Sequence, residues 1–491
     1  MKNFKYIFIF LSVIAFSSCE DLDINDNPNN VSETHPDLLL TNIITTAFQV
    51  QGTGAMYASR MIVQTDGENT SQFYKWDRAS FNDYNNLRQV TKMMEEAERI
   101  SDDSYIGIGY FFRAYYFYNL ALTFGDVPYA EALKGETEGL YQPSYSTQEE
   151  VFVGILNELE EANSLLDETN IITGDPIFNG DVSKWKKLVN SFRLKILLTL
   201  SNKEGNSSID IKSQFASIYN SEDIISASEE SARLEFVDVV NSRYTEFNSS
   251  SYGSGLYMAS TFVDMLKERE DPRLFAIAGQ TKNAKEAGLS IDDFSSYAGG
   301  NPVVPYNEVN LLAAAGEVSK VNDRYTADPT AEAHNLLSFS EVQFILAEAA
   351  VRGWISTANA QTFYENGIKA NFNFYNTYAK GYEAYYTETE AAEYIASTAV
   401  NFANVTTDAE KLNLILTQKY LTSFLQGGWR MYFDHLRTGY PAFPLGVGTA
   451  PTRWIYPLDE YNNNSENVTE AITRQFGASN DGIRELTWWL K

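Results

Sequence analysis

Two loop-like stretches of the chain, residues 72–78 and 241–252, carry side chains of the types that bind sugars. A sugar exposes apolar C–H faces and hydroxyl edges, so its site needs flat aromatic rings beside side chains that form hydrogen bonds. Both stretches combine Tyr, Trp or Phe with Arg, Asn or Gln in otherwise polar surroundings. The predicted ligand-binding residues are Tyr74, Trp76, Arg78, Tyr244 and Tyr252.

The same rings have an alternative role, which is to fasten loops onto the body of the protein. We favour that role for Phe73, Phe81 and Phe247. The ligand-binding hypothesis predicts that Trp76→Ala weakens oligosaccharide binding without lowering the melting temperature. A loss of stability with unchanged affinity would support the fastening role instead.

Motifs for catalysis or for metal binding are not found in the sequence. The three histidines, at positions 35, 334 and 435, are isolated and form no HExxH pattern. There is no Gly-x-Ser-x-Gly elbow and no phosphate-binding loop. An acidic run after position 20 resembles a calcium loop, but its sixth residue is Asp26 rather than Gly and its twelfth is Ser32 rather than Glu. We therefore expect no cofactor, no metal and no enzyme activity, although 65 acidic residues could form a glycosidase pair that no spacing reveals.

The first residues have the features of a bacterial lipoprotein signal. Residues 1–18 combine Lys2 and Lys5 with an apolar run that is too short to cross a bilayer. The only cysteine, Cys19, follows two serines, at the position where such a signal places the residue that receives lipid. Residues 19–36 form an acidic tether. We predict lipidation at Cys19, and the acids after it favour export to the outer face of the cell.

The net charge excludes one class of partner. The formal charge is -28 and the isoelectric point is near 4.5. A surface of this sign repels phosphate backbones, so we expect no nucleic acid partner.

A helical frame must position the binding loops. In the segment 338–375, Phe344, Ala347 and Val351 have helical spacing, and Ala360 and Gly367 repeat it after a break at Gly353. Small residues at these positions let two helices approach closely, as in tetratricopeptide pairs, and such pairs must stack to bury their apolar faces. Further pairs are predicted at 87–124, 147–201 and 407–436, which makes an all-α domain over residues 37–491 with about four pairs and few short strands.

An irregular region interrupts this frame. Residues 228–325 are rich in Gly, Ser, Asn and Pro, and they predict only one helix, from about 257 to 268. We interpret the region as a loop-rich insertion that covers one face of the helical stack and carries part of the predicted ligand site, namely Tyr244 and Tyr252. The last segment, which ends with Trp488 and Trp489, is predicted to be extended and packed.

Four motifs, together with the Cys19 signal, resemble the SusD/RagB family of nutrient-binding outer-membrane lipoproteins, in its SusD-like branch. They are RAYYFYNLALTFGDVPY at 113–129, LAEAAVRGW at 346–354, YENGIKANF at 364–372 and QGGWRMYFDHLRTGYP at 426–441. The resemblance covers nearly the whole chain after Cys19. It implies four tetratricopeptide-like pairs that support a variable ligand-binding face, whose residues do not transfer by motif.

The resemblance also implies a function. Members of the family are not enzymes, bind glycans or in some cases peptides, and cover the mouth of a SusC-like, TonB-dependent transporter in the outer membrane. The expected function is therefore to bind a glycan at the cell surface and to pass it to such a transporter. The alternatives are a peptide-binding member of the same system, a secreted glycoside-processing enzyme, and a tetratricopeptide scaffold that binds only protein.

Overall fold

The computed structural model describes residues 34–49, 52–250, 256–446 and 448–491. The predicted signal peptide, Cys19 and most of the tether lie outside these ranges, and so does Tyr252. Pro36–Lys491 form one unit. No helix within the described ranges has both the length and the apolar character that a membrane span needs.

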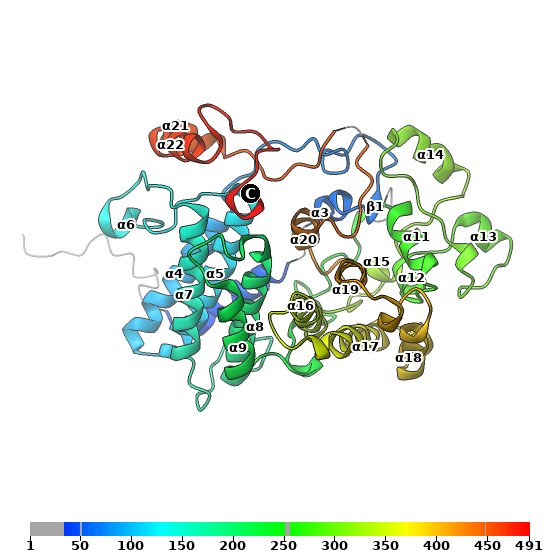
Figure 1. Ribbon diagram of the computed structural model, residues 1–491, viewed down its shortest axis with the longest axis horizontal. Coiled ribbons are helices and arrows are strands. Elements are labelled where there is room, and N and C mark those ends of the chain that lie inside the picture. The colour runs from blue at the N-terminus through cyan, green and yellow to red at the C-terminus, as the bar shows by residue number, and fades with distance from the viewer. Residues whose placement is uncertain (1–33, 50–51, 251–255, 447) are drawn as a thin grey trace, which may run out of the picture. The chain divides into compact units, whose positions relative to one another are not determined.

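All four predicted helix pairs are present, and the predicted all-α fold class is confirmed. The pairs are α4 (Asp83–Ile100) with α5 (Asp103–Phe124), α7 (Gln148–Leu165) with α8 (Val182–Thr199), α16 (Phe339–Val351) with α17 (Ala360–Tyr378), and α19 (Asp408–Leu421) with α20 (Arg430–Thr438). Figure 1 shows the first two pairs standing together at the left, with α16 and α17 below the centre.

The helix starts follow from local hydrogen bonding. Thr147 and Glu150 form a capping box at the start of α7, in which the side chain of each residue accepts a hydrogen bond from the backbone N–H of the other. Thr407 does the same for α19 with Glu410. In α5 the cap is Asp102, whose carboxylate accepts a hydrogen bond from the Ser104 amide at 3.0 Å.

Helix α5 lies inside the first two pairs, between α4 and α7. Its sequence is apolar on nearly all sides, which predicts burial between neighbours. The structure agrees, since Phe111, Phe112 and Phe117 are fully buried. This helix is the centre of the larger hydrophobic cluster, which also contains Trp76 and Trp454.

Close packing of α16 against α17 depends on Gly367, as the spacing of small residues predicts. A Cβ atom at this position would lie 2.7 Å from the Phe344 ring, well inside normal contact distance. The Gly367 carbonyl also accepts a hydrogen bond from the Ser340 hydroxyl at 2.7 Å. The two helices therefore touch at a point where no side chain fits.

Gly367→Ala is expected to lower the free energy of unfolding by about 1–3 kcal/mol, because overpacking forces the helices apart. Chemical denaturation of the two proteins measures the difference. Gly279→Ala is the matched control, since the nearest atom to its added Cβ would be the Lys320 carbonyl oxygen at 3.7 Å. Equal losses at both positions would show that Gly367 has no special packing role.

The rest of the chain is more helical than the sequence predicts. In the described part of the insertion, α11 lies at the predicted place and four further short α-helices are present, and the last segment is partly helical rather than extended. Short helices such as α22 bury only one narrow stripe, here Val468, Ala471 and Ile472, so their periodicity is weak. Among the described residues, the remaining α-helices are α2 (Pro36–Ala47), α3 (Gly54–Ala58), α6 (Gly135–Glu138), α9 (Ile211–Ser221), α11 (Ser260–Glu268), α12 (Arg273–Ile277), α13 (Lys282–Glu286), α14 (Tyr306–Ala314), α15 (Arg324–Ala327), α18 (Glu388–Ala396), α21 (Leu458–Asn463) and α22 (Ser465–Phe476).

Two small antiparallel sheets join distant parts of the described chain. β1 (Ile62–Val63) pairs with β3 (Tyr257–Met258), so the first long loop is tied to the insertion. β2 (Ala232–Leu234) pairs with β4 (His334–Leu337), so the two ends of the insertion meet. These contacts fix where the insertion enters and leaves the helical frame.

Helix α20 lies where the halves of the core meet. Tyr432 and Phe433 belong to the larger hydrophobic cluster, which is centred on α5. Their neighbour Met431 belongs to a second cluster, which contains α11, α12 and much of α17. One short helix therefore contributes to both clusters.

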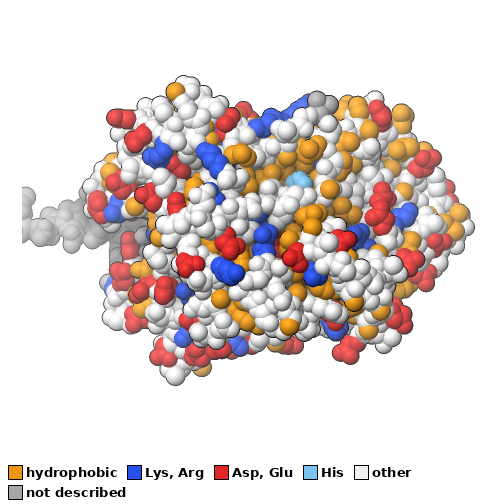
Figure 2. All heavy atoms as spheres, in the orientation of Figure 1, with side chains coloured by type: hydrophobic (Ala, Val, Ile, Leu, Met, Phe, Trp, Pro, Cys, Tyr) orange, Lys and Arg blue, Asp and Glu red, His pale blue; other side chains and the backbone are white. Residues whose placement is uncertain are grey.

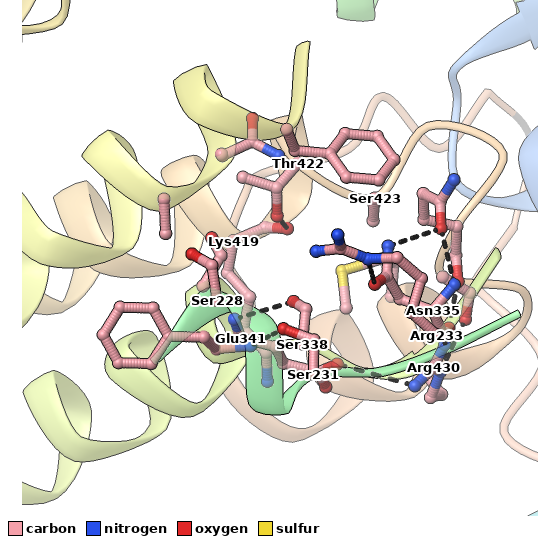
Figure 3. Close-up of a pocket in the computed structure, with 18 residues that line it drawn as sticks. Ser228, Ser231, Arg233, Asn335, Ser338, Glu341, Lys419, Thr422, Ser423 and Arg430 are labelled. Carbon is pink, nitrogen blue, oxygen red and sulfur yellow. Dashed lines mark hydrogen bonds and ion pairs between the residues drawn. The ribbon is translucent and has the colours of Figure 1, made fainter. Parts of the chain in front are cut away.

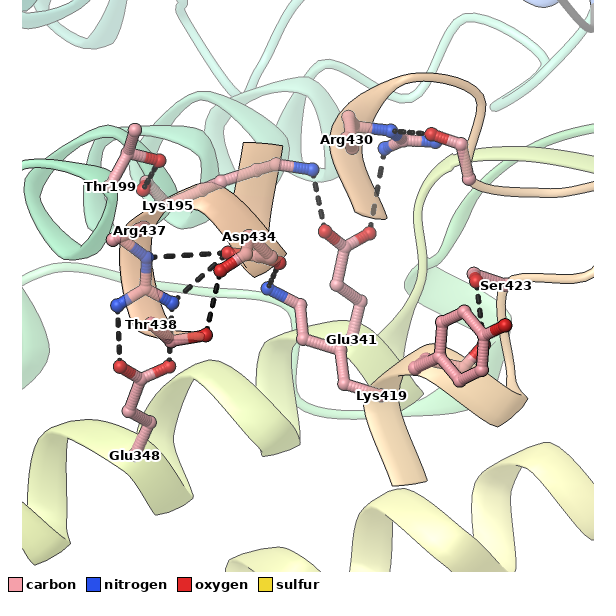
Figure 4. Close-up of polar contacts among 12 residues, drawn as sticks. Lys195, Thr199, Glu341, Glu348, Lys419, Ser423, Arg430, Asp434, Arg437 and Thr438 are labelled. Atoms are coloured by element: carbon pink, nitrogen blue, oxygen red, sulfur yellow. Dashed lines mark hydrogen bonds and ion pairs between the residues drawn. The ribbon is translucent and has the colours of Figure 1, made fainter. Parts of the chain in front are cut away.

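A network of buried ion pairs surrounds α20 (Figure 4). Arg437 pairs with Glu348 at 2.5 Å and with Asp434 at 3.0 Å. Asp434 also accepts a hydrogen bond from Lys419 at 2.6 Å. In a second branch, Glu341 pairs with Lys195 at 2.5 Å and with Arg430 at 3.5 Å. The network thus connects α8, α16, α19 and α20.

Candidate functional site

The structure places the predicted aromatic residue Trp76 in the core. Its side chain is only 7% exposed and stacks on Trp454 with ring centroids 4.9 Å apart. Its Nε1–H donates to the Arg453 carbonyl at 3.1 Å. Tyr74 is also buried, and its hydroxyl donates to the Ala58 carbonyl at 2.9 Å. Both rings therefore fasten their loop to the core, which is the alternative role considered for them above. Neither ring offers a free face to a ligand.

The other predicted residues are not brought together with them. Tyr244 is buried against Phe236 and His334, at ring distances of 5.5 and 5.2 Å. Arg78 is partly exposed, but it donates to the Tyr456 carbonyl at 2.5 Å and lies over the Tyr461 ring. Tyr252 lies outside the described residues.

Phe73 and Lys75, between the buried residues of the same stretch, point the other way. Tyr74 has a left-handed backbone, with φ of 55°, and this turn reverses the direction of its neighbours. Phe73 is half-buried and Lys75 is exposed. The stretch 72–78 therefore reaches the surface through Phe73 and Lys75, which are not among the predicted ligand-binding residues, as well as through Arg78.

A groove forms where this stretch meets two other loops. Its walls are Phe73 and Lys75, the segment 302–306 of the insertion, and residues 445–446. The hollow has a cavity volume of about 490 Å³, and we call it the loop groove. The Tyr306 ring, at the start of α14, is 38% exposed. Figure 2 shows hydrophobic side chains gathered over the α14 side of this face, while charged side chains are scattered more evenly over the helices at the left.

Two buried polar residues hold the floor of the loop groove. The Gln72 side chain accepts from the Gln64 amide at 2.8 Å and donates to the Pro302 carbonyl at 3.1 Å. Arg60 donates to the Pro444 carbonyl at 3.1 Å and to the Gln72 carbonyl. Burial lowers the pKa of Arg60. All three loops are thereby fixed by side chains that bond backbone carbonyls, so the groove is formed without a ligand.

The groove has the chemistry of a binding site. Phe73 and Tyr306 supply ring faces for apolar C–H groups, and the exposed pair of Lys75 with Glu68 supplies charged hydrogen-bonding groups. Lys75 also lies 5.8 Å from the centre of the Phe73 ring. Within the described ranges, no group of three or more His, Cys, Asp or Glu side chains has the geometry to hold a metal.

A second hollow, with a cavity volume of only about 40 Å³, lies around the first turn of α16 (Figure 3). Its polar groups largely bond one another. Ser338 accepts from the Glu341 amide at 3.1 Å, Ser231 accepts from the Phe339 amide at 3.0 Å, and Arg233 donates to Asn335 at 3.2 Å. These bonds fasten β2 and β4 to α16. The loop groove, with its exposed rings, is therefore the better candidate for a ligand.

Comparison with known proteins identifies the family. The family model described as "Starch-binding associating with outer membrane" matches residues 28–457. A SusD homolog from Bacteroides fragilis NCTC 9343 is 48% identical, with a TM-score of 0.89 over 94% of this chain and 100% of that chain. A protein from Bacteroides vulgatus ATCC 8482, named as an outer membrane protein with a suggested part in nutrient binding, is 47% identical, with a TM-score of 0.90 over 93% and 100%.

A further SusD homolog from Bacteroides fragilis is 31% identical, with a TM-score of 0.87 over 93% of this chain and 100% of that one. The search of curated proteins gave no match. The family model and these structures agree with the all-α fold described above and with the family that the sequence resembles. The chain therefore belongs to the SusD-like family of outer-membrane nutrient-binding proteins.

Proposed function

We propose that this protein binds a glycan in the loop groove and passes it to a SusC-like, TonB-dependent transporter in the outer membrane. It acts as a binding protein and not as an enzyme. Membership of the SusD-like family supports nutrient binding at the outer membrane. Cys19, in its lipoprotein signal, supports a lipid anchor, and the acids after it favour the outer face of the cell.

The observation that carries the proposal is the pair of accessible rings in the loop groove. Phe73 and Tyr306 come from segments far apart in the sequence, yet both line one hollow beside Lys75 and Glu68. A sugar ring needs this combination of apolar faces and hydrogen-bonding edges. The floor formed by Gln72 and Arg60 keeps the rings in place before the ligand arrives, which lowers the entropic cost of binding.

Phe73→Ala and Tyr306→Ala are each expected to weaken oligosaccharide binding about tenfold, since each removes about 1.4 kcal/mol of stacking energy. A chain that begins at Glu20 is suitable, because Pro36–Lys491 form one unit. Affinity electrophoresis against a panel of polysaccharides finds the glycan, and calorimetry then measures Kd for each variant.

Tyr141→Ala is the control for loss of an exposed aromatic ring, because Tyr141 is 77% exposed and lies away from the groove residues. Its Kd should not change. Unchanged Kd for both groove variants would contradict the proposed site. Binding of peptides alone would favour the peptide-binding alternative, and release of shorter sugars would revive the enzyme.

A further inference from the structure

A third hollow, with a cavity volume of about 110 Å³, opens between the helix pairs, and we call it the seam pocket. It is lined by Asp83 at the start of α4, by Tyr115 and Asn119 of α5, by His334 of β4, and by Trp429. None of these residues lines the loop groove. This is several times the space that one water molecule needs, so the pocket can admit a small polar group of a ligand.

Asp83 supplies the seam pocket with an acceptor that has no cation beside it. The partner of its carboxylate among the described residues is the Asn86 amide, at the long distance of 3.5 Å. Burial raises the pKa of Asp83 to about 6, and the Asn86 contact only partly opposes this rise. A carboxylate in such a place gains free energy from any donor that enters the pocket.

His334 supplies a second acceptor. The side chain is 2% exposed, and its Nδ1 lies 2.9 Å from the Phe48 carbonyl, so Nδ1 carries the proton. Burial lowers the pKa of His334 to about 4, which keeps the ring neutral. Its Nε2 is then an acceptor, and it has no hydrogen-bond partner within the described ranges. A buried acceptor without a partner is uncommon and indicates a missing donor.

Arg430 also lines the seam pocket, but its donors are already in use (Figures 3 and 4). Its acceptors are the carbonyls of Gly427, Gln426, Leu336 and Asn335 and the carboxylate of Glu341. The guanidinium therefore neither neutralises Asp83 nor bonds His334. Asp83 and His334 therefore still lack a donor, and a ligand cation with several N–H groups would supply one to both.

The seam pocket also has aromatic walls, which a cation-binding site can use. Tyr115, Trp429 and Phe433 line the same hollow, and the faces of such rings attract a cation through their quadrupoles. An ammonium group has three donors, which suit a carboxylate and an imidazole nitrogen, and it tolerates aromatic contact. We propose that the seam pocket binds the primary ammonium group of a small ligand, through Asp83, His334 Nε2 and the ring of Trp429.

Two kinds of nutrient carry this group, an amino sugar and the amino terminus of a peptide. Calorimetry with glucosamine and with glycylglycine amide distinguishes them, and their N-acetylated forms remove the charge. We expect one ammonium probe to bind and its N-acetylated form to bind at least tenfold more weakly. Glucosamine binding assigns the pocket to amino sugars, and binding of the dipeptide amide assigns it to peptides.

Asp83→Asn keeps the size of the side chain but removes its charge, so it should weaken binding of the ammonium probe at least tenfold. The matched control is Asp77→Asn, since Asp77 is an exposed acid outside the pocket. Phe73→Ala should leave this binding unchanged, which separates the seam pocket from the loop groove. The inference is overturned if neither ammonium probe binds, if the N-acetylated forms bind equally well, or if Asp83→Asn has no effect.

Discussion

Trp76→Ala is expected to lower the free energy of unfolding by about 3–5 kcal/mol, the usual range for removing a large buried ring. Besides stacking on Trp454, Trp76 meets Trp429 and Tyr432 edge to face, at 5.4 and 5.3 Å. The substitution leaves a cavity among these rings and removes the donor to the Arg453 carbonyl. Urea denaturation followed by fluorescence or circular dichroism measures the loss.

This result would reverse the expectation from the sequence, which was weaker oligosaccharide binding at an unchanged melting temperature. Lys75→Ala, one residue earlier, is the control, because an exposed side chain contributes little and its loss should stay within about 0.5 kcal/mol. A variant at Trp76 that is as stable as the parent but fails to bind glycan would restore the original hypothesis.

Glu348→Ala is also expected to lower the free energy of unfolding by about 3–5 kcal/mol, because it leaves the buried Arg437 guanidinium without its main partner. Both side chains are 1% exposed, and their two hydrogen bonds are 2.5 and 2.9 Å long. Denaturation at neutral pH measures the change. Glu286→Ala removes an exposed pair with Lys282 and should cost at most about 1 kcal/mol.

The same network predicts how stability depends on pH. Burial opposes ionisation of Glu348 and Asp434, but their cationic partners, chiefly Arg437 and Lys419, outweigh it and hold both pKa values below the usual range. A carboxyl whose pKa is lower in the folded state stabilises the fold above its unfolded pKa of about 4 and loses this effect as pH falls. The parent should therefore lose stability below about pH 4, and Glu348→Ala should lose less over that interval. Parallel curves for the two proteins would be evidence against the ion-pair role.

The helical frame could be predicted because its signals are local. Spacing in α16 and α17, and capping boxes at Thr147 and Thr407, involve residues within a few positions of one another. The groove could not be predicted in this way. In the stretch 72–78, the side on which each ring lies is decided by the turn at Tyr74 and by Trp454, which is far away in the sequence.

The seam pocket shows the same limit. His334 appears in the sequence as an isolated histidine, and Asp83 as one acid among many. They line one hollow only because β4 and the start of α4 meet beside the loop before α20. The sequence shows only that His334 does not belong to a metal-binding motif, because no other potential ligand lies near it at a suitable spacing.

Helix α20 has a consequence for how the domain comes apart. Met431 packs in one hydrophobic cluster, and Tyr432 and Phe433 pack in the other. Unfolding of either cluster would therefore displace α20 and remove its side chains from the other cluster as well. We therefore expect the two clusters to unfold together as one cooperative unit. The loop groove takes one wall from the segment that ends in Trp76 and another from the segment after Phe443, which belong to different clusters. Cooperative melting thus keeps the two walls in register for as long as the protein remains folded.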